Sequence, residues 1–111
     1  MLEIYPIILS YVADIAELTP CIGRHDPDLA RQLRRSSSSV ALNCSEAMYA
    51  RGRSRTASYN IALREMRESH AVLEISLRLR YLSPLSAELE DRIQRIIGTL
   101  YRLSFPRQAA R

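Results

Sequence analysis

The sequence predicts an all-α protein, an antiparallel up-down four-helix bundle that associates with copies of itself. A chain of 111 residues is the size of a single domain. Three glycines, one Phe and no Trp leave little material for twisted strands and tight hairpins, whereas the abundant Ala, Leu, Ile, Arg and Glu favour helix. Apolar residues recur every three or four positions in four segments separated by short breaks, which favours antiparallel neighbours. We therefore expect one domain over residues 1–111, with helices at about 4–19, 27–50, 54–82 and 86–105.

The first predicted helix has one apolar face. Alternating steps of four and three residues place its large apolar side chains on that face, which consists of Ile4, Ile8, Tyr11, Ile15, Leu18 and Ile22. Pro6 fits the first turn, where no intrahelical N–H is lost. Pro20 lacks the N–H that a helix interior needs, so we expect it to end or kink the helix, and Gly23 to complete the break.

The second predicted helix begins at Asp26-Pro27, because Asp26 can cap it and Pro27 suits the first helical position. Its inward face consists of Leu29, Leu33, Ser36 or Ser37, Val40, Cys44 and Ala47. The serine run 36–39 is a poor helix former by itself, yet its small side chains let a neighbouring helix approach closely. We interpret this run as a packing surface and not as a linker.

The third predicted helix, capped by Ser54, is the longest and carries two apolar stripes. One stripe consists of Tyr59, Leu63, Met66, His70, Leu73 and Leu77. The second lies on a different face of the C-terminal half and consists of Val72, Ile75, Leu79 and Leu82. A small monomer rarely needs a helix that is apolar nearly all round, and an exposed apolar stripe usually marks an interface. We therefore predict that the second stripe joins the subunits of a homo-oligomer.

The fourth predicted helix follows a break at Ser83-Pro84. Ser86 can cap it, and Glu88, Glu90 and Asp91 in its first turn complement the helix dipole. Its inward face consists of Leu89, Ile93, Ile96, Leu100 and Leu103.

Positive charge is concentrated between residues 31 and 55, where six arginines accompany a single acid, Glu46. They form two groups of three, namely Arg31, Arg34 and Arg35, and Arg51, Arg53 and Arg55. One interpretation is a nucleic-acid-binding surface, since guanidinium groups match phosphate geometry and each contact releases counterions. The other is a solvated face, or arginines that reach Glu65 and Glu68 of a neighbouring subunit. Both interpretations stay open. The later helices instead offer pairs of opposite charge four residues apart, such as Arg64 with Glu68 and Glu88 with Arg92.

The sequence offers no recognisable catalytic or metal-binding motif. His70 and Glu74 would need further inward carboxylates to form a di-iron site, and no glycine-rich phosphate loop or activated serine is present. Asn43, Glu46 and Ser69 are polar residues expected inside the bundle, and we assign them to a structural network that fixes helix register. We expect no enzyme activity, no cofactor and no metal.

The two cysteines, Cys21 and Cys44, predict reduced thiols and a cytoplasmic protein, since neither a disulfide framework nor a zinc site can be built from them. The N-terminal apolar segment carries Glu3, Asp14 and Glu17 and has no basic residue before it. We therefore expect neither a signal peptide nor a membrane span.

Residues 32–47, QLRRSSSSVALNCSEA, resemble the signature of the four helix bundle protein family, which is related to proteins encoded in 23S rRNA intervening sequences. Asn43 and Glu46 match the polar pair of that signature, and Ala47 stands where the family usually has Gly. Downstream, Tyr59, Ser69 and Leu73-Glu74 also match, whereas Glu68 and Val72 depart from the pattern.

The resemblance spans about residues 29–82 and implies an antiparallel four-helix bundle that assembles into a homopentamer. One class of relatives, the accessory variability determinants of diversity-generating retroelements, forms a basic ring that engages nucleic acid and a reverse transcriptase. We therefore expect a non-enzymatic oligomer whose arginine-rich face contacts nucleic acid or a protein partner. The alternatives are a structural scaffold that binds only proteins, and a metal- or ligand-binding enzyme that uses His70, Glu74 and Glu46.

Overall fold

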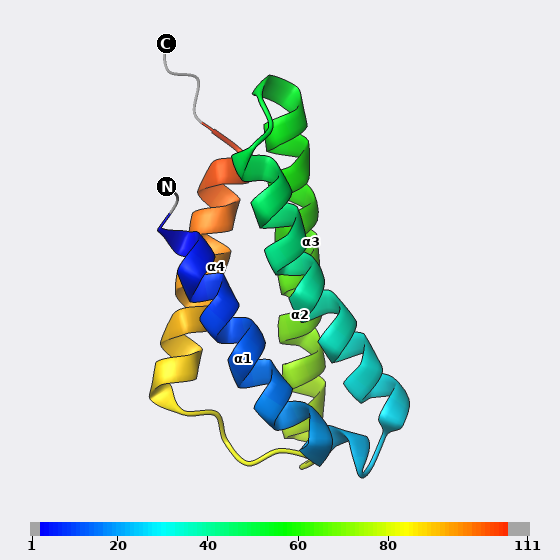
Figure 1. Cartoon of the computed structure of the whole chain (residues 1–111). Coiled ribbons are helices and arrows are strands. Elements are labelled where there is room, and N and C mark those ends of the chain that lie inside the picture. The colour runs from blue at the N-terminus through cyan, green and yellow to red at the C-terminus, as the bar shows by residue number, and fades with distance from the viewer. Residues whose placement is uncertain (1–2, 107–111) are drawn as a thin grey trace.

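The computed structural model describes residues 3–106 and contains four helices and no strand within that range. The helices are α1 (Ile4–Gly23), α2 (Pro27–Met48), α3 (Gly52–Arg78) and α4 (Ala87–Ser104). They form an elongated helical bundle that measures 49 × 23 × 21 Å (Figure 1). The predicted domain runs over residues 1–111, of which 1–2 and 107–111 lie outside the described part.

Each helix packs beside the next one in the chain, and α4 also contacts α1, so the helices surround a common core. Of these four contacts, that between α2 and α3 is the most extensive and that between α1 and α4 is the smallest. In Figure 1 the α1–α2 turn and the α3–α4 connection lie at the lower end, and the α2–α3 turn lies at the upper end. At the lower end His25 stacks on Tyr81, with ring centroids 4.6 Å apart, and so joins the two connections.

The core contains most of the residues that the helical periodicity predicts. Every predicted apolar position of α1 is buried except Leu18, which is half-buried while Thr19 beside it is buried. The buried face of α3 differs from the predicted stripe. The small residues Ala62, Ser69 and Ser76 are buried, whereas His70 of the stripe is half-buried. The apolar faces of all four helices therefore meet in one continuous core.

Helix α1 continues through Pro20 to Gly23, so the predicted end at about residue 19 is wrong. Pro20 has no N–H to donate to the carbonyl four residues earlier. That carbonyl belongs to Ala16, and the Thr19 hydroxyl donates to it at 3.2 Å. The neighbouring threonine thus supplies the hydrogen bond that proline removes, and the helix gains one more turn.

Helices α2 and α4 begin as predicted. The Asp26 carboxylate accepts a hydrogen bond from the Leu29 N–H at 3.1 Å, and Pro27 is the first residue of α2. The Ser86 hydroxyl oxygen accepts from the Leu89 N–H at 3.1 Å. These caps satisfy backbone donors that would otherwise have no intrahelical partner.

Helix α3 starts at Gly52 and ends at Arg78, so it begins earlier and ends earlier than predicted, and Ser54 is not its cap. Gly52 has a φ of 55°, which glycine adopts without strain. At the other end the Tyr81 N–H donates to the Ser76 carbonyl at 2.8 Å, and the Arg80 N–H donates to the Leu77 carbonyl at 3.1 Å. These two bonds form a Schellman motif, which places Arg80 in the left-handed region at φ 64°.

Helix α1 is long and apolar enough to cross a membrane by length and composition alone, with a mean hydropathy of 1.2. Core helices of soluble proteins meet the same criterion, so this finding is weak evidence for a span. The inward face of α1 packs in the bundle core.

Arg80→Gly should stabilise the protein, because glycine removes the steric cost that a Cβ incurs at positive φ. We expect the free energy of unfolding to rise by about 1 kcal/mol, less the extra conformational entropy of glycine in the unfolded chain. Urea titration monitored by circular dichroism measures this change. Arg78→Gly, inside the last turn of α3, is the matched control and should destabilise the protein. A loss of stability in Arg80→Gly would show that the arginine side chain makes a contact that outweighs the strain.

Candidate nucleic-acid interface

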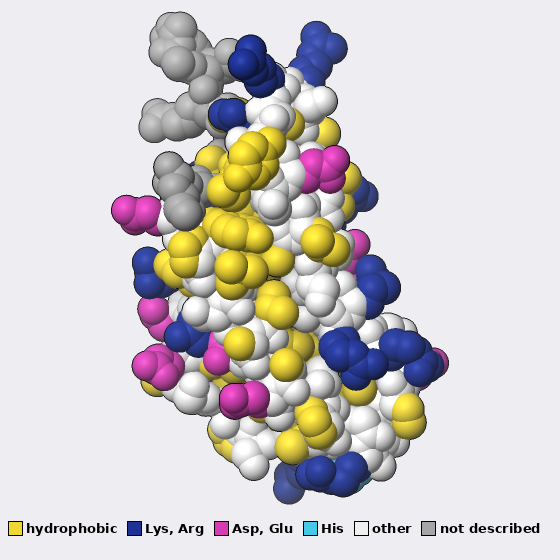
Figure 2. All heavy atoms as spheres, in the orientation of Figure 1, with side chains coloured by type: hydrophobic (Ala, Val, Ile, Leu, Met, Phe, Trp, Pro, Cys, Tyr) yellow, Lys and Arg dark blue, Asp and Glu magenta, His cyan; other side chains and the backbone are white. Residues whose placement is uncertain are grey.

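The α2–α3 turn projects three arginine side chains from one end of the bundle. Arg51 precedes the first turn of α3, Arg53 and Arg55 lie within that turn, and all three are exposed. The Arg55 Nε donates to the Ala50 carbonyl at 3.0 Å, which ties the start of α3 to the end of the preceding turn. Figure 2 shows basic side chains at this end of the molecule, at the top of the view. We call Arg51, Arg53 and Arg55 the tip arginines.

The tip arginines form no ion pair with any acid in residues 3–106. Beside them lies Tyr49, the residue that caps the C-terminus of α2, with 85% of its surface exposed. Tyr49 was not predicted as a site residue, because a tyrosine at the end of an amphipathic helix is usually part of the core. Its position next to a break rich in arginine was the signal that could have identified it.

The other three predicted arginines lie at the opposite end of α2. Arg35 lies 13 residues before Met48, the last residue of α2, so about 20 Å of helix separates it from the α2–α3 turn at 1.5 Å per residue. Arg31 forms an ion pair with Asp28. Arg35 contacts Glu65 at 3.3 Å and also pairs with Glu68, and its hydrogen bond to Glu68 is the main cause of the raised pKa of Arg35. The two predicted groups therefore lie apart, and Arg31 and Arg35 are paired with acids whereas the tip arginines are not.

The ion pairs of the described residues do not follow the predicted spacing of four residues. Glu68 pairs with Arg35 of α2 and not with Arg64, and Arg92 pairs with Asp14 of α1. Glu65 and Glu68 were considered as partners for an arginine of a neighbouring subunit. In the structure they bind Arg35 of the same chain.

The polar residues assigned to one network lie in three separate places. Ser69 is fully buried, and its hydroxyl forms a hydrogen bond with the Tyr11 hydroxyl. Asn43 donates from Nδ2 to the Ser39 carbonyl at 2.9 Å, a contact within its own helix. Glu46 is exposed. The predicted network is therefore wrong for Asn43 and Glu46, and Ser69 instead joins α3 to α1.

Burial raises the pKa of Tyr11 to about 12. It also raises the pKa of Cys44 to about 11, so this fully buried thiol stays protonated at neutral pH. Both cysteines are free, as the sequence predicts.

Half of the predicted interface stripe lies inside the bundle. Val72 is only 3% exposed and Leu82 only 9%, whereas Ile75 is 45% exposed and Leu79 is 52% exposed. The expectation that all four residues need a neighbouring subunit is therefore wrong for Val72 and Leu82. Further apolar side chains gather over α1 and α4, as Figure 2 shows, and the large exposed ones on these helices are Leu9 and Tyr101.

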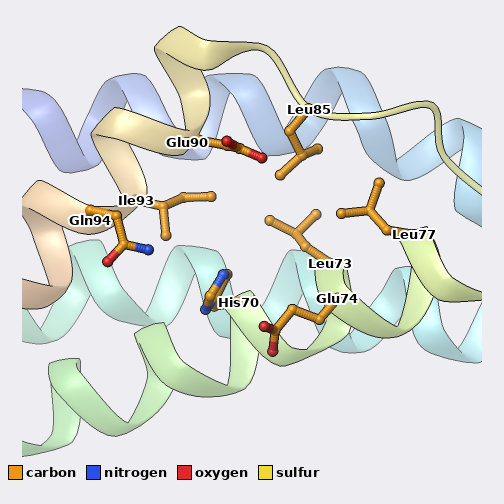
Figure 3. A pocket seen from close by; sticks show the side chains of 8 residues that line it. All are labelled: His70, Leu73, Glu74, Leu77, Leu85, Glu90, Ile93 and Gln94. Carbon is orange, nitrogen blue, oxygen red and sulfur yellow. The ribbon is translucent and has the colours of Figure 1, made fainter.

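A cavity of about 380 Å³ lies between the C-terminal half of α3 and the N-terminal half of α4. Its polar lining comes from His70 and Glu74 of α3 and from Glu90 and Gln94 of α4 (Figure 3). The remaining lining is apolar and consists of Leu73, Leu77, Leu85 and Ile93. Glu46 is not part of the lining, and residues 3–106 contain no cluster of three metal-ligating side chains. The enzyme hypothesis based on His70, Glu74 and Glu46 therefore lacks its assembled site.

Comparison with protein families identifies the chain. The family described as "23S rRNA-intervening sequence protein" matches residues 1–102, which include all of the outer helices except the last two residues of α4. The chain belongs to this family. The family resemblance seen at about residues 29–82 is therefore confirmed, and the match extends over almost the whole bundle.

A solved structure shares the fold of this 23S rRNA-intervening sequence protein. It is a protein of unknown function from the S23 ribosomal protein family of Bacteroides thetaiotaomicron, 22% identical, with a TM-score of 0.67 over 91% of each chain. At this identity the similarity concerns the fold alone. No curated protein matches the chain.

The buried Tyr11 predicts a loss of stability in alkali. Its pKa is raised from 10.0 to about 12, so the folded state holds the phenolic proton more tightly than the unfolded state does. The contribution of this proton to the free energy of unfolding is fully present below pH 10 and is lost between pH 10 and about 12. Tyr11→Phe should remove this dependence, which is on the order of 2 kcal/mol.

Urea titrations from about pH 9 to 12 test this prediction in the wild type and in Tyr11→Phe. Tyr5→Phe, at a half-buried tyrosine of the same helix, is the control. A difference in unfolding free energy between the wild type and Tyr11→Phe that stays constant over this range would contradict the prediction.

Proposed function

We propose that this protein is a non-enzymatic, oligomeric four-helix bundle that binds nucleic acid through the tip arginines. The observation that supports the proposal is the exposure of Arg51, Arg53 and Arg55 at one end of the bundle, with no carboxylate paired to any of them in the described chain. A guanidinium group already paired with a carboxylate gains little from a phosphate. The tip arginines have no such pair to break.

The proposed binding is electrostatic and has little sequence preference. Guanidinium forks fit phosphate oxygens, and each phosphate contact releases condensed counterions, so affinity falls steeply with salt. The family name and the name of the structural neighbour refer to ribosomal RNA or to ribosomes, which makes RNA one of the nucleic acids to test.

We further propose that each subunit is an antiparallel up-down bundle and that the subunits assemble into a pentamer in the cytoplasm. The positions of the three connections in Figure 1 are consistent with alternating helix directions. Exposed Ile75 and Leu79 supply apolar surface for a subunit contact. A ring of subunits would repeat the tip arginines around its axis and strengthen the field that attracts a polyanion.

A scaffold that binds only proteins is the second candidate, and the exposed apolar residues Leu9, Tyr101 and Phe105 favour it. Affinity purification from cells with and without nuclease treatment separates the two functions. Partners that survive complete nuclease digestion support the scaffold, and partners that disappear support nucleic acid.

Replacing the three tip arginines by glutamine should weaken nucleic-acid binding and flatten its salt dependence. Because the variant cannot neutralise the three phosphates that these arginines bind, the slope of log affinity against log salt should fall by about 2 for a single strand and by about 3 for a duplex. Filter binding of short DNA and RNA over a salt series from about 50 to 200 mM measures both quantities.

The matched control replaces Arg67, Arg78 and Arg95, which are also exposed, so that the net charge changes equally. This control should keep most of the affinity and the slope. Equal losses of affinity in both triple variants would show that only net charge matters, which would contradict a site at the tip. No retention of wild-type complexes at the lowest salt would reject nucleic-acid binding altogether.

Replacing Ile75 and Leu79 together by glutamate should reduce the mass of the oligomer, because two charges would have to be buried in the subunit contact. Both side chains are exposed in the single chain, so the fold should persist. Light scattering measures the mass, and circular dichroism checks the helix content. Leu42→Glu, at a 69% exposed position on α2, is the control. A wild type of monomer mass, or a double variant of unchanged mass, would contradict the assignment.

A further inference from the structure

We infer that the tip binds single-stranded nucleic acid in preference to duplex, with one base stacked on the ring of Tyr49. This inference rests on the proposed function and specifies its substrate class. It depends on the exposed ring of Tyr49, which is 85% exposed beside the tip arginines.

Tyr49 has no competing aromatic contact. The other strongly exposed aromatic residues, Tyr101 and Phe105, pack on each other with centroids 5.0 Å apart, and Tyr81 is stacked on His25. No such stacking partner is found for Tyr49 among the described aromatic side chains. Exposing both faces of an aromatic ring to water is unfavourable for the folded protein. Such a ring is suited to stack on an external partner.

The backbone around Tyr49 is held in place at the tip. The Tyr49 N–H donates to the Glu46 carbonyl at 3.2 Å, and the Ala50 N–H donates to the Ala47 carbonyl at 3.1 Å. The Ala50 carbonyl in turn accepts the hydrogen bond from Arg55 Nε at 3.0 Å. The ring and the guanidinium groups therefore belong to one short hydrogen-bonded segment and not to a free loop.

Tyr49 and the tip arginines are close enough in the sequence for one nucleotide to contact both. Arg51 lies two residues from Tyr49 and Arg53 lies four residues away, so their Cα atoms are within about 7 and 14 Å of that of Tyr49. A base on the ring would thus carry its flanking phosphates within reach of long arginine side chains.

Stacking distinguishes the two forms of nucleic acid. In a duplex the base faces are covered by neighbouring pairs, so Tyr49 gains nothing and only the arginines contribute. In a single strand an unstacked base offers its face, and base–aromatic stacking combined with basic side chains is how proteins bind single strands without sequence preference.

Fluorescence anisotropy with three labelled probes tests the inference. The probes are an oligothymidylate of about 12 nucleotides, an abasic strand of equal length, and a duplex of equal length, all at about 50 mM salt. The wild type should bind oligothymidylate at least about tenfold more tightly than the abasic strand. Tyr49→Ala should weaken oligothymidylate binding by about tenfold and leave the abasic strand and the duplex within about twofold.

Two further variants serve as controls. Tyr49→Phe keeps the stacking face and should bind like the wild type, and Leu42→Ala removes another exposed apolar side chain of α2 and should have no effect. Light scattering of Tyr49→Ala should give the wild-type mass.

The following outcomes would contradict the inference. Unchanged oligothymidylate binding in Tyr49→Ala, together with weakened binding in the tip-arginine variant, overturns the inference and leaves the proposed function standing. A lower mass in Tyr49→Ala also overturns it, because the ring would then be a subunit contact. If none of the probes binds the wild type, the proposed function fails as well.

Discussion

The close packing of α2 against α3 determines how the rest of the molecule is arranged. Buried positions of α2 hold small side chains, and two of them, Ser36 and Ser37, direct their hydroxyls to carbonyls of their own helix at 3.2 and 3.1 Å. They are therefore satisfied without a partner from another helix and leave a smooth surface for α3. The buried face of α3 also holds small residues, among them Ala62 and Ser69. These two helices, with 22 and 27 residues, are the longest in the bundle, and α1 and α4 pack along the pair.

The packing of α2 on α3 explains why Arg35 is paired with acids and the tip arginines are not. At the start of α2, Arg35 lies across from two glutamates of α3, because the paired helices bring residues 30 positions apart into contact. At the other end α2 stops and α3 starts on a glycine, so the tip arginines extend beyond the region where α3 supplies acids. The same packing thus pairs Arg35 with acids of α3 and leaves the tip arginines without an ion pair in the described chain. Loops held by a rigid scaffold commonly carry binding residues for this reason.

The sequence is a good guide to local features and a poor guide to contacts between helices. Both side-chain caps, Asp26 and Ser86, follow from residues within three positions of each other, and the inward faces follow from periodicity. The passage of α1 through Pro20 is also local, since Thr19 supplies the missing hydrogen bond, but a proline inside a helical pattern usually predicts an end. Ion pairs such as Arg92 with Asp14, and the Tyr11–Ser69 hydrogen bond, join residues far apart in the chain. No spacing rule within one helix could have predicted them.

The two apolar stripes of α3 have a simpler cause than oligomerisation. Helix α3 packs against α2 and also against α4, so it needs two apolar faces within a single chain, and Val72 is buried. Leu82 is also buried but lies in the connection that follows α3. The remaining exposed pair, Ile75 and Leu79, is small compared with an obligate interface, which usually buries about 2,000 Å² or more. A stable oligomer would therefore have to extend its contact to other apolar residues. The exposed apolar side chains on α1 and α4 are the surface that this requirement favours, because α1 and α4 share the smallest contact among the four neighbouring helix pairs.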